Sequence, residues 1–183
     1  SMKLLVGLTG YARSGKDTAA AYLAEIFQMD HRAFAESLKR ITAILADEPV
    51  ANFHDDVLTE QFCPALGMTR RTAMQVVGTE MVRERFGPDI WHTNLLNSWR
   101  AQGCGPTVIS DVRFGNEARA VRNAGGVVVR IVRPGAGLGG EAADHTSEQG
   151  GSGHLVDFTI ANDGSHAELY IKLHELMRVL GVD

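Results

Sequence analysis

The chain has 183 residues, with 18 lysines and arginines against 22 aspartates and glutamates, so its formal charge is −4 with neutral histidines. This length is that of one ordinary domain, which buries roughly 70% of its unfolded surface, and it argues against a second full domain. The charge excludes a global attraction to nucleic acid or to an anionic membrane, so any basic site is local.

The spacing of the cysteines and the length of the apolar runs indicate the cellular compartment in which we expect the protein. Cys63 and Cys104 lie far apart and outside any C-x-x-C spacing, so we expect neither a disulfide framework nor a structural zinc site. No apolar run approaches the ~20 residues of a membrane span, and the first residues lack a signal-peptide pattern. We therefore expect a reducing, cytoplasmic setting and neither a membrane nor a nucleic-acid partner.

The first elements are predicted as strand, loop and helix. "KLLVGL" (3–8) is a nearly continuous apolar run, typical of a strand buried on both faces of a parallel sheet. Residues 16–27 then show helical spacing. "HRAFA" (31–35) predicts a second strand and residues 36–46 a second helix, whereas residues 47–68 show no clear pattern.

The next segments predict further helices and then βαβ units. Residues 71–87 and 88–102 are helical in pattern, and the second segment begins with Pro88. Three strands are then predicted, at 106–112, 127–132 and 157–163, together with two helices, at 116–126 and 165–180. One glycine-rich loop is predicted at 134–153. This alternation predicts one α/β domain with a helical insert at about 47–103 and a lid at about 133–153.

The strongest chemical signal is "GLTGYARSGKDTAA" (7–20). Gly10, Gly15 and Lys16 have the G-x-x-x-x-G-K spacing, in which glycines let the backbone wrap a phosphate and the lysine adds a point charge. An ordinary glycine-rich turn is the alternative, but the strand before the loop and the helix after it favour phosphate binding.

Asp17 stands where this motif places a Mg²⁺-binding serine or threonine. Its carboxylate is a hard oxygen ligand that binds Mg²⁺ directly or through water, or else Thr18 supplies a hydroxyl one residue later. A third interpretation makes Asp17 only an acidic residue in the first turn of a helix.

Further candidates follow strands or flank loops. Asp111 closes an apolar strand, so we expect its carboxylate at the carboxyl edge of the sheet, where it organises Mg²⁺ or, alternatively, caps the next helix. Guanidinium groups match phosphates, and the arginines nearest to loops are Arg13, Arg71, Arg113 and Arg133. Trp91 stacks on a base or packs inside a helix layer, and the turn alone explains Asn162.

Seven segments between Gly7 and Gly164 complete the picture: "GYARSGKDT", "FAESLKR", "RTAMQVVGTEMVRERFGPDIW", "VISDVRFGNEA", "VVVRIVRPG", "DHTSE" and "FTIANDG". In this order they resemble the phage-type deoxynucleoside monophosphate kinases, a branch of the P-loop nucleoside and nucleotide kinases. The resemblance implies a three-layer α/β/α fold with a five-stranded parallel sheet in the order 2-3-1-4-5. It departs at Gly115, where the family pattern has proline.

The resemblance also implies a reaction: transfer of the γ-phosphoryl group of ATP to a deoxynucleoside 5′-monophosphate, with Mg²⁺. The residues that would hold the ATP phosphates are Arg13, Gly15, Lys16, Asp17 and Thr18. Those that would line the acceptor site are Ala35, Leu38, Lys39, Arg71 and Gln75. Asp111 and Arg113 would lie between the substrates, and Glu148 would face the acceptor nucleoside.

These roles combine into one expected mechanism. Lys16, Arg113 and Arg133 would stabilise the moving phosphoryl group, and Asp17 and Asp111 would organise Mg²⁺. The alternatives are a kinase that resembles animal phosphomevalonate kinase, dephospho-coenzyme A kinase, and a P-loop switch protein without phosphotransfer. The accepted bases, the choice between deoxyribose and ribose, and the oligomeric state, with a homodimer as one alternative, stay open.

Overall fold

The computed structural model describes residues 3–136 and 155–183. The chain divides into two compact units, which are described separately below. The first comprises Ser1–Ala33 and Leu96–Asp183, and the second is Phe34–Leu95.

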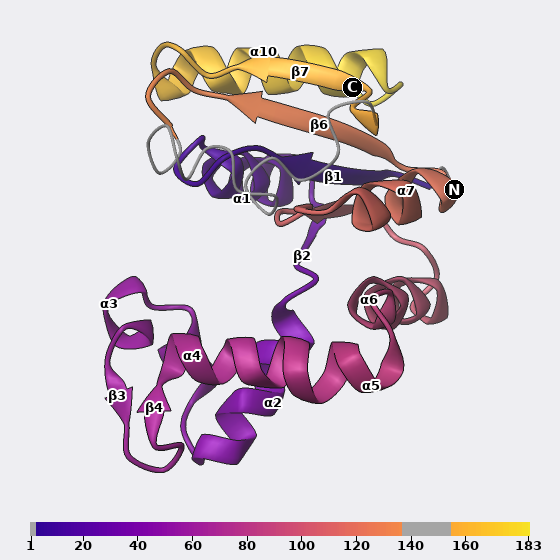
Figure 1. Cartoon of the computed structure of the whole chain (residues 1–183). Coiled ribbons are helices and arrows are strands. Elements are labelled where there is room, and N and C mark those ends of the chain that lie inside the picture. Colours follow the sequence, from indigo (N-terminus) through magenta and orange to yellow (C-terminus); the bar gives the residue numbers. More distant parts are fainter. Residues whose placement is uncertain (1–2, 137–154) are drawn as a thin grey trace. The chain divides into compact units, whose positions relative to one another are not determined.

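A five-stranded parallel sheet forms the centre of the first unit (Figure 1). Its strands, in spatial order, are β2 (Asp30–Arg32), β5 (Thr107–Ile109), β1 (Leu5–Thr9), β6 (Val127–Val132) and β7 (Phe158–Ala161). Counted along the chain, this is the order 2-3-1-4-5, so the predicted sheet is confirmed. The second strand is shorter than predicted, because the chain after Arg32 turns toward the next helix.

Helices cover both faces of this sheet. Val6 and Leu8 of β1 belong to a buried cluster with side chains of α1 (Lys16–Ile26) and α10 (His166–Val179). Successive strand residues point to opposite faces, and a Cβ added to Gly7 would lie 3.3 Å from Val121 of α7 (Gly115–Asn123). Helices α1 and α10 therefore cover one face and α7 the other, which confirms the three-layer architecture (Figure 1).

The second unit is mostly helical. Its main helices are α2 (Glu36–Ala46) and the continuous run of α4 (Arg70–Gln75), the π-helix η2 (Val76–Arg83) and α5 (Glu84–Phe86). Helix α6 (Ile90–Ala101) spans the boundary of the two units in sequence. Short elements fill the part that showed no pattern, namely η1 (Val50–Phe53), α3 (Asp56–Thr59), β3 (Phe62–Cys63) and β4 (Met68–Thr69).

A polar cluster, here called the Glu48 network, fixes these short elements. Arg70 donates from Nε and Nη2 to the two Glu48 carboxylate oxygens, at 2.8 and 3.0 Å. Asn52 and the buried Cys63 thiol donate to the same carboxylate, at 2.8 and 3.0 Å. These hydrogen bonds, that from Arg70 first, lower the pKa of Glu48 to about 2. The network thereby joins the end of α2 to the β3–β4 hairpin.

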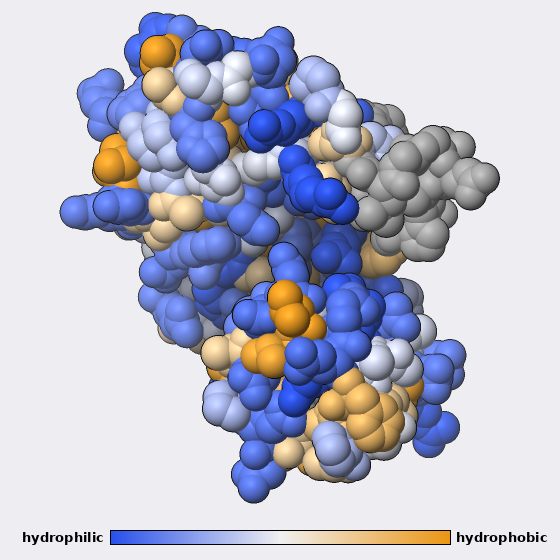
Figure 2. All heavy atoms as spheres, turned by 90° about the vertical axis from the view of Figure 1, so that its left-hand side faces the viewer, coloured by the Kyte–Doolittle hydropathy of each residue, from blue (hydrophilic) through white to orange (hydrophobic). Residues whose placement is uncertain are grey.

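The face of the molecule drawn in Figure 2 is mainly polar. Figure 2 shows polar side chains over most of one face, with apolar side chains in scattered places. Among the described residues, the most exposed large apolar side chains are those of Ile44 at 77% and Phe86 at 72%. In the part of the chain that the structure describes, no helix has the length and apolar character needed to cross a membrane.

Candidate functional site

The loop after β1 has the backbone of an anion cradle. Gly10 and Gly15 have φ of 148° and 103°, a region that L side chains rarely adopt. A Cβ at Gly10 would lie 2.4 Å from the Ile131 carbonyl oxygen, and one at Gly15 would lie 2.4 Å from the Asn162 amide nitrogen. Both positions therefore require glycine, and the loop leads into the N-terminus of α1, where backbone N–H groups favour an anion.

Two side chains of this loop fit a phosphate ligand. Lys16 holds its Nζ 2.6 Å from the Gly10 carbonyl oxygen, so the ammonium lies at the loop. Ser14 is 1% exposed, and its hydroxyl has no hydrogen-bond partner among the described residues. Because a buried polar atom without a partner is costly, this hydroxyl supports binding of a ligand rich in oxygen acceptors.

The interpretation of Asn162 as a turn residue is wrong. Its side chain is 4% exposed, and Nδ2 donates to the Ser14 carbonyl oxygen at 2.9 Å. The two residues are 148 positions apart, so no local motif could predict the contact. Asn162 is thus a buried contact that supports the loop from Gly10 to Lys16, here called the phosphate loop.

Three predicted residues lie at the same edge of the sheet as this loop. Asp111 and Arg113 follow β5, Arg133 follows β6, and both strands pair in parallel with β1. The carboxyl ends of parallel strands meet at one edge, which is where ligands bind in such folds. Asp111 is half-buried, and both arginines are exposed. The fold therefore brings Lys16 to the same edge as these three residues.

A buried glutamate fixes the segment after Asp111. Glu117 is 5% exposed, and its Oε1 accepts hydrogen bonds from the backbone N–H groups of Arg113 at 2.8 Å and Phe114 at 2.9 Å. This side chain restrains the loop although Gly115 stands where the resemblance leads us to expect a proline. A glutamate at the third position of a helix is a known start signal, so the sequence could have revealed it.

The remaining residues predicted to hold the ATP phosphates lie in the loop and in the first turn of α1. Arg13 is exposed and has φ of 63°, Asp17 is exposed, and Thr18 is half-buried. Mg²⁺ prefers carboxylate and hydroxyl oxygens, so Asp17, Thr18 and Asp111 fit this ion chemically. Within 3–136 and 155–183, no group of three or more His, Cys, Asp or Glu side chains is placed to hold a metal ion. The Mg²⁺ assignment stays a prediction.

In the second unit, the first residues predicted to line the site of the acceptor nucleotide lie at the start of α2. Ala35 precedes the helix, and Leu38 packs where Gly78 lacks a side chain, since a Cβ there would lie 3.1 Å from it. The Lys39 ammonium lies 3.3 Å from His54 Nδ1, which must accept because lysine only donates. Burial, and then the charge of Lys39, lower the pKa of His54.

The other acceptor candidates are on α4 and α6. Arg71 forms an ion pair through Nε with Glu60, and the two side chains are 53% and 59% exposed. Gln75, the last residue of α4, is exposed. Trp91 is 8% exposed and donates from Nε1 to the Gly78 carbonyl oxygen at 3.1 Å. This geometry favours the packed tryptophan, one of the two interpretations open from sequence.

The predicted lid falls largely outside the described residues. Glu148 lies there, so its role stays a prediction. The described start of this segment is a turn, in which the Ala136 N–H donates to the Arg133 carbonyl oxygen at 3.1 Å.

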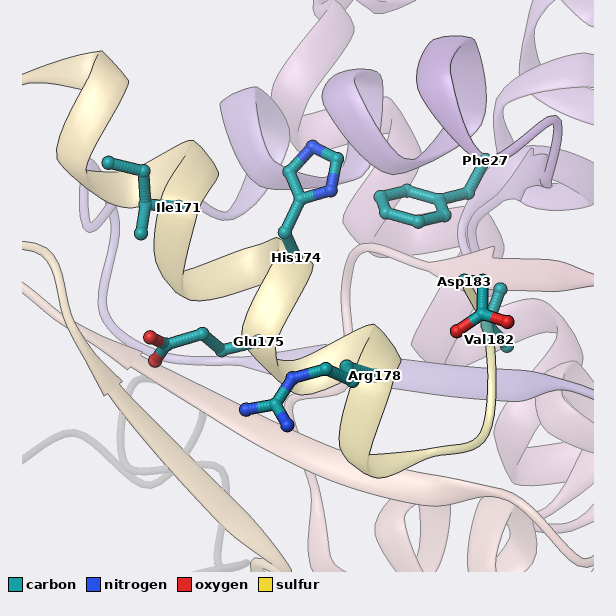
Figure 3. A pocket seen from close by; sticks show the side chains of 7 residues that line it. All are labelled: Phe27, Ile171, His174, Glu175, Arg178, Val182 and Asp183. Atoms are coloured by element: carbon teal, nitrogen blue, oxygen red, sulfur yellow. The ribbon is translucent and has the colours of Figure 1, made fainter.

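A surface pocket lies at the last turns of α1 and α10. Its lining includes Phe27, His174 and Arg178, which Figure 3 shows together with the chain end. Both helices begin at carboxyl ends of strands, β1 and β7, so their last turns lie at the opposite edge of the sheet. None of the predicted site residues lines this pocket, and it is distinct from the phosphate loop.

Comparisons with known protein sequences agree with each other. A family model described as "Deoxynucleotide monophosphate kinase" matches residues 65–173. The chain is 32% identical, over 72% of its length and 75% of the relative's, to a "Putative deoxynucleotide monophosphate kinase" of Acanthamoeba polyphaga mimivirus. It is 30% identical, over 60% of its length, to the "Deoxynucleotide monophosphate kinase" of Enterobacteria phage T4. The match spans only 46% of that phage protein.

Solved structures extend the comparison to the fold. A dephospho-CoA kinase from Campylobacter jejuni has a TM-score of 0.57 and 13% identity, over 96% of each chain. A shikimate kinase from Aquifex aeolicus has a TM-score of 0.55 and 12% identity, over 97% of this chain and 99% of the other. At such identities the likeness shows the fold alone, which is that of P-loop kinases.

Proposed function

Because the chain belongs to the deoxynucleotide monophosphate kinase family, we propose that it transfers the γ-phosphoryl group of ATP to a deoxynucleoside 5′-monophosphate. The products are ADP and the deoxynucleoside diphosphate. Membership of the family makes the chain a nucleotide kinase. The donor, the acceptor and the use of Mg²⁺ are the proposed steps beyond it.

The observation that carries the proposal is the loop from Gly10 to Lys16. Its two glycines have conformations that side chains would block, and Lys16 lies against the loop with its ammonium. Aligned N–H groups and a lysine are what the β- and γ-phosphates of a nucleotide require. We assign the ATP phosphates to this loop, with contacts from Arg13, Gly15, Lys16, Asp17 and Thr18.

Catalysis by these residues is mainly positioning and neutralisation of charge. An acceptor phosphate is already anionic near neutral pH and needs no strong base. Lys16, Arg113 and Arg133 bind the transferring group, and their fixed positive charges offset the repulsion between two anionic substrates. In-line transfer then requires only that the phosphates of the two substrates are held in line with each other.

Bound Mg²⁺ would supply positive charge that neutralises the phosphates. Proteins usually hold this ion with one or two carboxylates together with substrate phosphates. Asp17 and Asp111 would supply such carboxylates, Asp17 directly or through water, and Thr18 would supply a hydroxyl.

The acceptor is assigned mainly to residues of the second unit. Arg71 is the proposed phosphate ligand there, because its partner Glu60 is exposed and a phosphate can replace it. The other proposed contacts are Ala35, Leu38, Lys39 and Gln75, with Asp111, Arg113 and Glu148 from the rest of the chain.

A coupled assay of ADP formation tests the proposal. ATP and Mg²⁺ are offered with each of the four common deoxynucleoside monophosphates, and we expect at least one to raise ADP formation well above the ATP-only blank. The variant Lys16→Ala serves as the control for contaminating kinases. No rise with any deoxynucleotide would contradict the proposal, and a rise with phosphomevalonate alone would select the rival kinase. Acceptor-independent binding or hydrolysis of ATP would indicate a switch protein.

A further inference from the structure

We propose that Asn162 is a positioning residue of the ATP site. Its buried amide fixes the peptide between Ser14 and Gly15, so that the Gly15 N–H is directed to the bound phosphates. This assignment rests on the proposed function, because it takes the nucleotide phosphates as the ligand of the loop.

Asn162 is held by elements other than the loop that it contacts. Its backbone N–H donates to the Val132 carbonyl oxygen at 2.7 Å, which continues the pairing of β7 with β6. On either side of it, Lys172 of α10 donates to the Ala161 carbonyl oxygen at 2.6 Å and lies 3.4 Å from Asp163 Oδ1. The sheet and α10 therefore set the place of the amide, which can in turn set that of the loop.

The direction of the Gly15 N–H follows from peptide geometry. No described peptide bond is cis, and the carbonyl and N–H of one planar trans peptide point in opposite directions. The Ser14 carbonyl oxygen accepts from Asn162 Nδ2 at 2.9 Å. The N–H of Gly15, on the other end of the same peptide, therefore points away from Asn162. It is one of the backbone donors that a phosphate-binding nest requires.

The side chain of Asn162 and the missing side chain of Gly15 are adapted to each other. A Cβ at Gly15 would lie 2.4 Å from Asn162 Nδ2, so the amide uses the space that any other residue would fill. Removing the amide leaves the Ser14 carbonyl without this partner and lets the peptide rotate. An aspartate instead places an acceptor against an acceptor, so Asn162→Asp is the more disruptive change.

The test is the affinity for ADP, measured by calorimetry without an acceptor. We expect Asn162→Ala to weaken ADP binding about tenfold, and Asn162→Asp to weaken it more. The matched control is Asn123→Ala, at an exposed position at the end of α7, and we expect its affinity within about twofold of the unaltered protein. In turnover assays the KM for ATP rises in Asn162→Ala, whereas the KM for the acceptor changes by less than about twofold.

ADP affinity in a folded Asn162→Ala equal to that of the unaltered protein would overturn the proposal. If that variant fails to fold, the unaltered ¹⁵N-labelled protein decides. We expect the Gly15 N–H resonance to shift on saturation with ADP, with the Asn162 side-chain amide protons slow to exchange. A Gly15 resonance that does not move would also overturn it. ADP binding by the unaltered protein without turnover of deoxynucleotides would contradict the proposed function, and the ADP affinities of the Asn162 variants would still decide the role of Asn162.

Discussion

The two compact units hold their candidate site residues in different ways. In the first, buried side chains bind the backbone of two site segments: Asn162 binds Ser14 in the phosphate loop, and Glu117 binds the N–H groups after Asp111. In the second, Arg71 and Gln75 lie on exposed helix faces, and the partner of Arg71 is the equally exposed Glu60.

This difference separates a preformed site from an adjustable one. Buried supports cannot be changed without leaving a polar group unsatisfied, whereas an exposed ion pair is worth about 1 kcal/mol or less. We therefore expect changes in the loop to abolish turnover. Changes in the second unit should alter acceptor affinity while turnover at saturation persists.

Replacement of Lys16 gives the largest expected effect. Lys16→Ala removes a fixed charge from the transferring phosphoryl group, and we expect turnover to fall by about 10²- to 10³-fold or more. The fold should be retained, as judged by circular dichroism and thermal melting. Lys3→Ala, at an exposed position outside the loop, is the control. Near-normal activity of Lys16→Ala would contradict the role of the loop.

Arg71→Ala tests the adjustable site. Loss of a guanidinium–phosphate contact should raise the KM for the deoxynucleotide about tenfold and leave the KM for ATP unchanged. Steady-state kinetics with one substrate varied at a time measure both values, and Arg85→Ala, on an exposed part of α5, is the matched control. An increase in the KM for ATP instead would remove Arg71 from the acceptor site.

Asp17 lies at the start of α1, and its variants test the proposed Mg²⁺ site. We expect Asp17→Ser to keep some activity, because a hydroxyl is the usual ligand at this position of the motif, and Asp17→Ala to need severalfold more Mg²⁺. Titration of Mg²⁺ at fixed ATP measures the requirement. The same Mg²⁺ dependence in both variants and the unaltered protein would reduce Asp17 to a helix-start charge.

Glu60→Gln should have a small effect of the opposite sign. Without the carboxylate, Arg71 no longer exchanges a partner when phosphate binds, so the KM for the acceptor should fall about twofold. When Arg71→Ala is already present, adding Glu60→Gln should not lower the KM for the acceptor. A higher KM in Glu60→Gln would mean that the ion pair orients Arg71 for binding.

Glu48→Gln should leave turnover unchanged and affect stability alone. The pKa of Glu48 is lowered from 4.5 to about 2 in the folded chain, so its carboxylate stabilises the fold above about pH 4.5 and this contribution is lost as the pH falls toward 2. The unaltered protein should therefore melt higher than Glu48→Gln at pH 6, by a margin that narrows at pH 3. A constant margin would assign the Glu48 network no charge-dependent role.

Some elements were predictable because their hydrophobic pattern extends over enough residues to show its period. The apolar run before the phosphate loop and the helical spacing after it predicted β1 and α1, and the later alternation predicted the parallel sheet. Between Asp47 and Met68 the elements have only two to four residues. Such elements are too short for a period of 2 or 3.6 to show, and tertiary contacts such as the Glu48 network hold them in place.

The spatial order of the strands was implied by the family resemblance. The sequence by itself determined the alternation of strands and helices, the phosphate-loop motif, and the placement of Asp111 at the carboxyl edge. These depend on local periodicity and on fixed spacing within a few residues. Only the tertiary structure decided that Asn162 supports the loop, and that Trp91 is buried with its N–H on the Gly78 carbonyl. A short polar side chain suits a turn and a buried hydrogen bond equally well, and the choice depends on residues that only folding brings near.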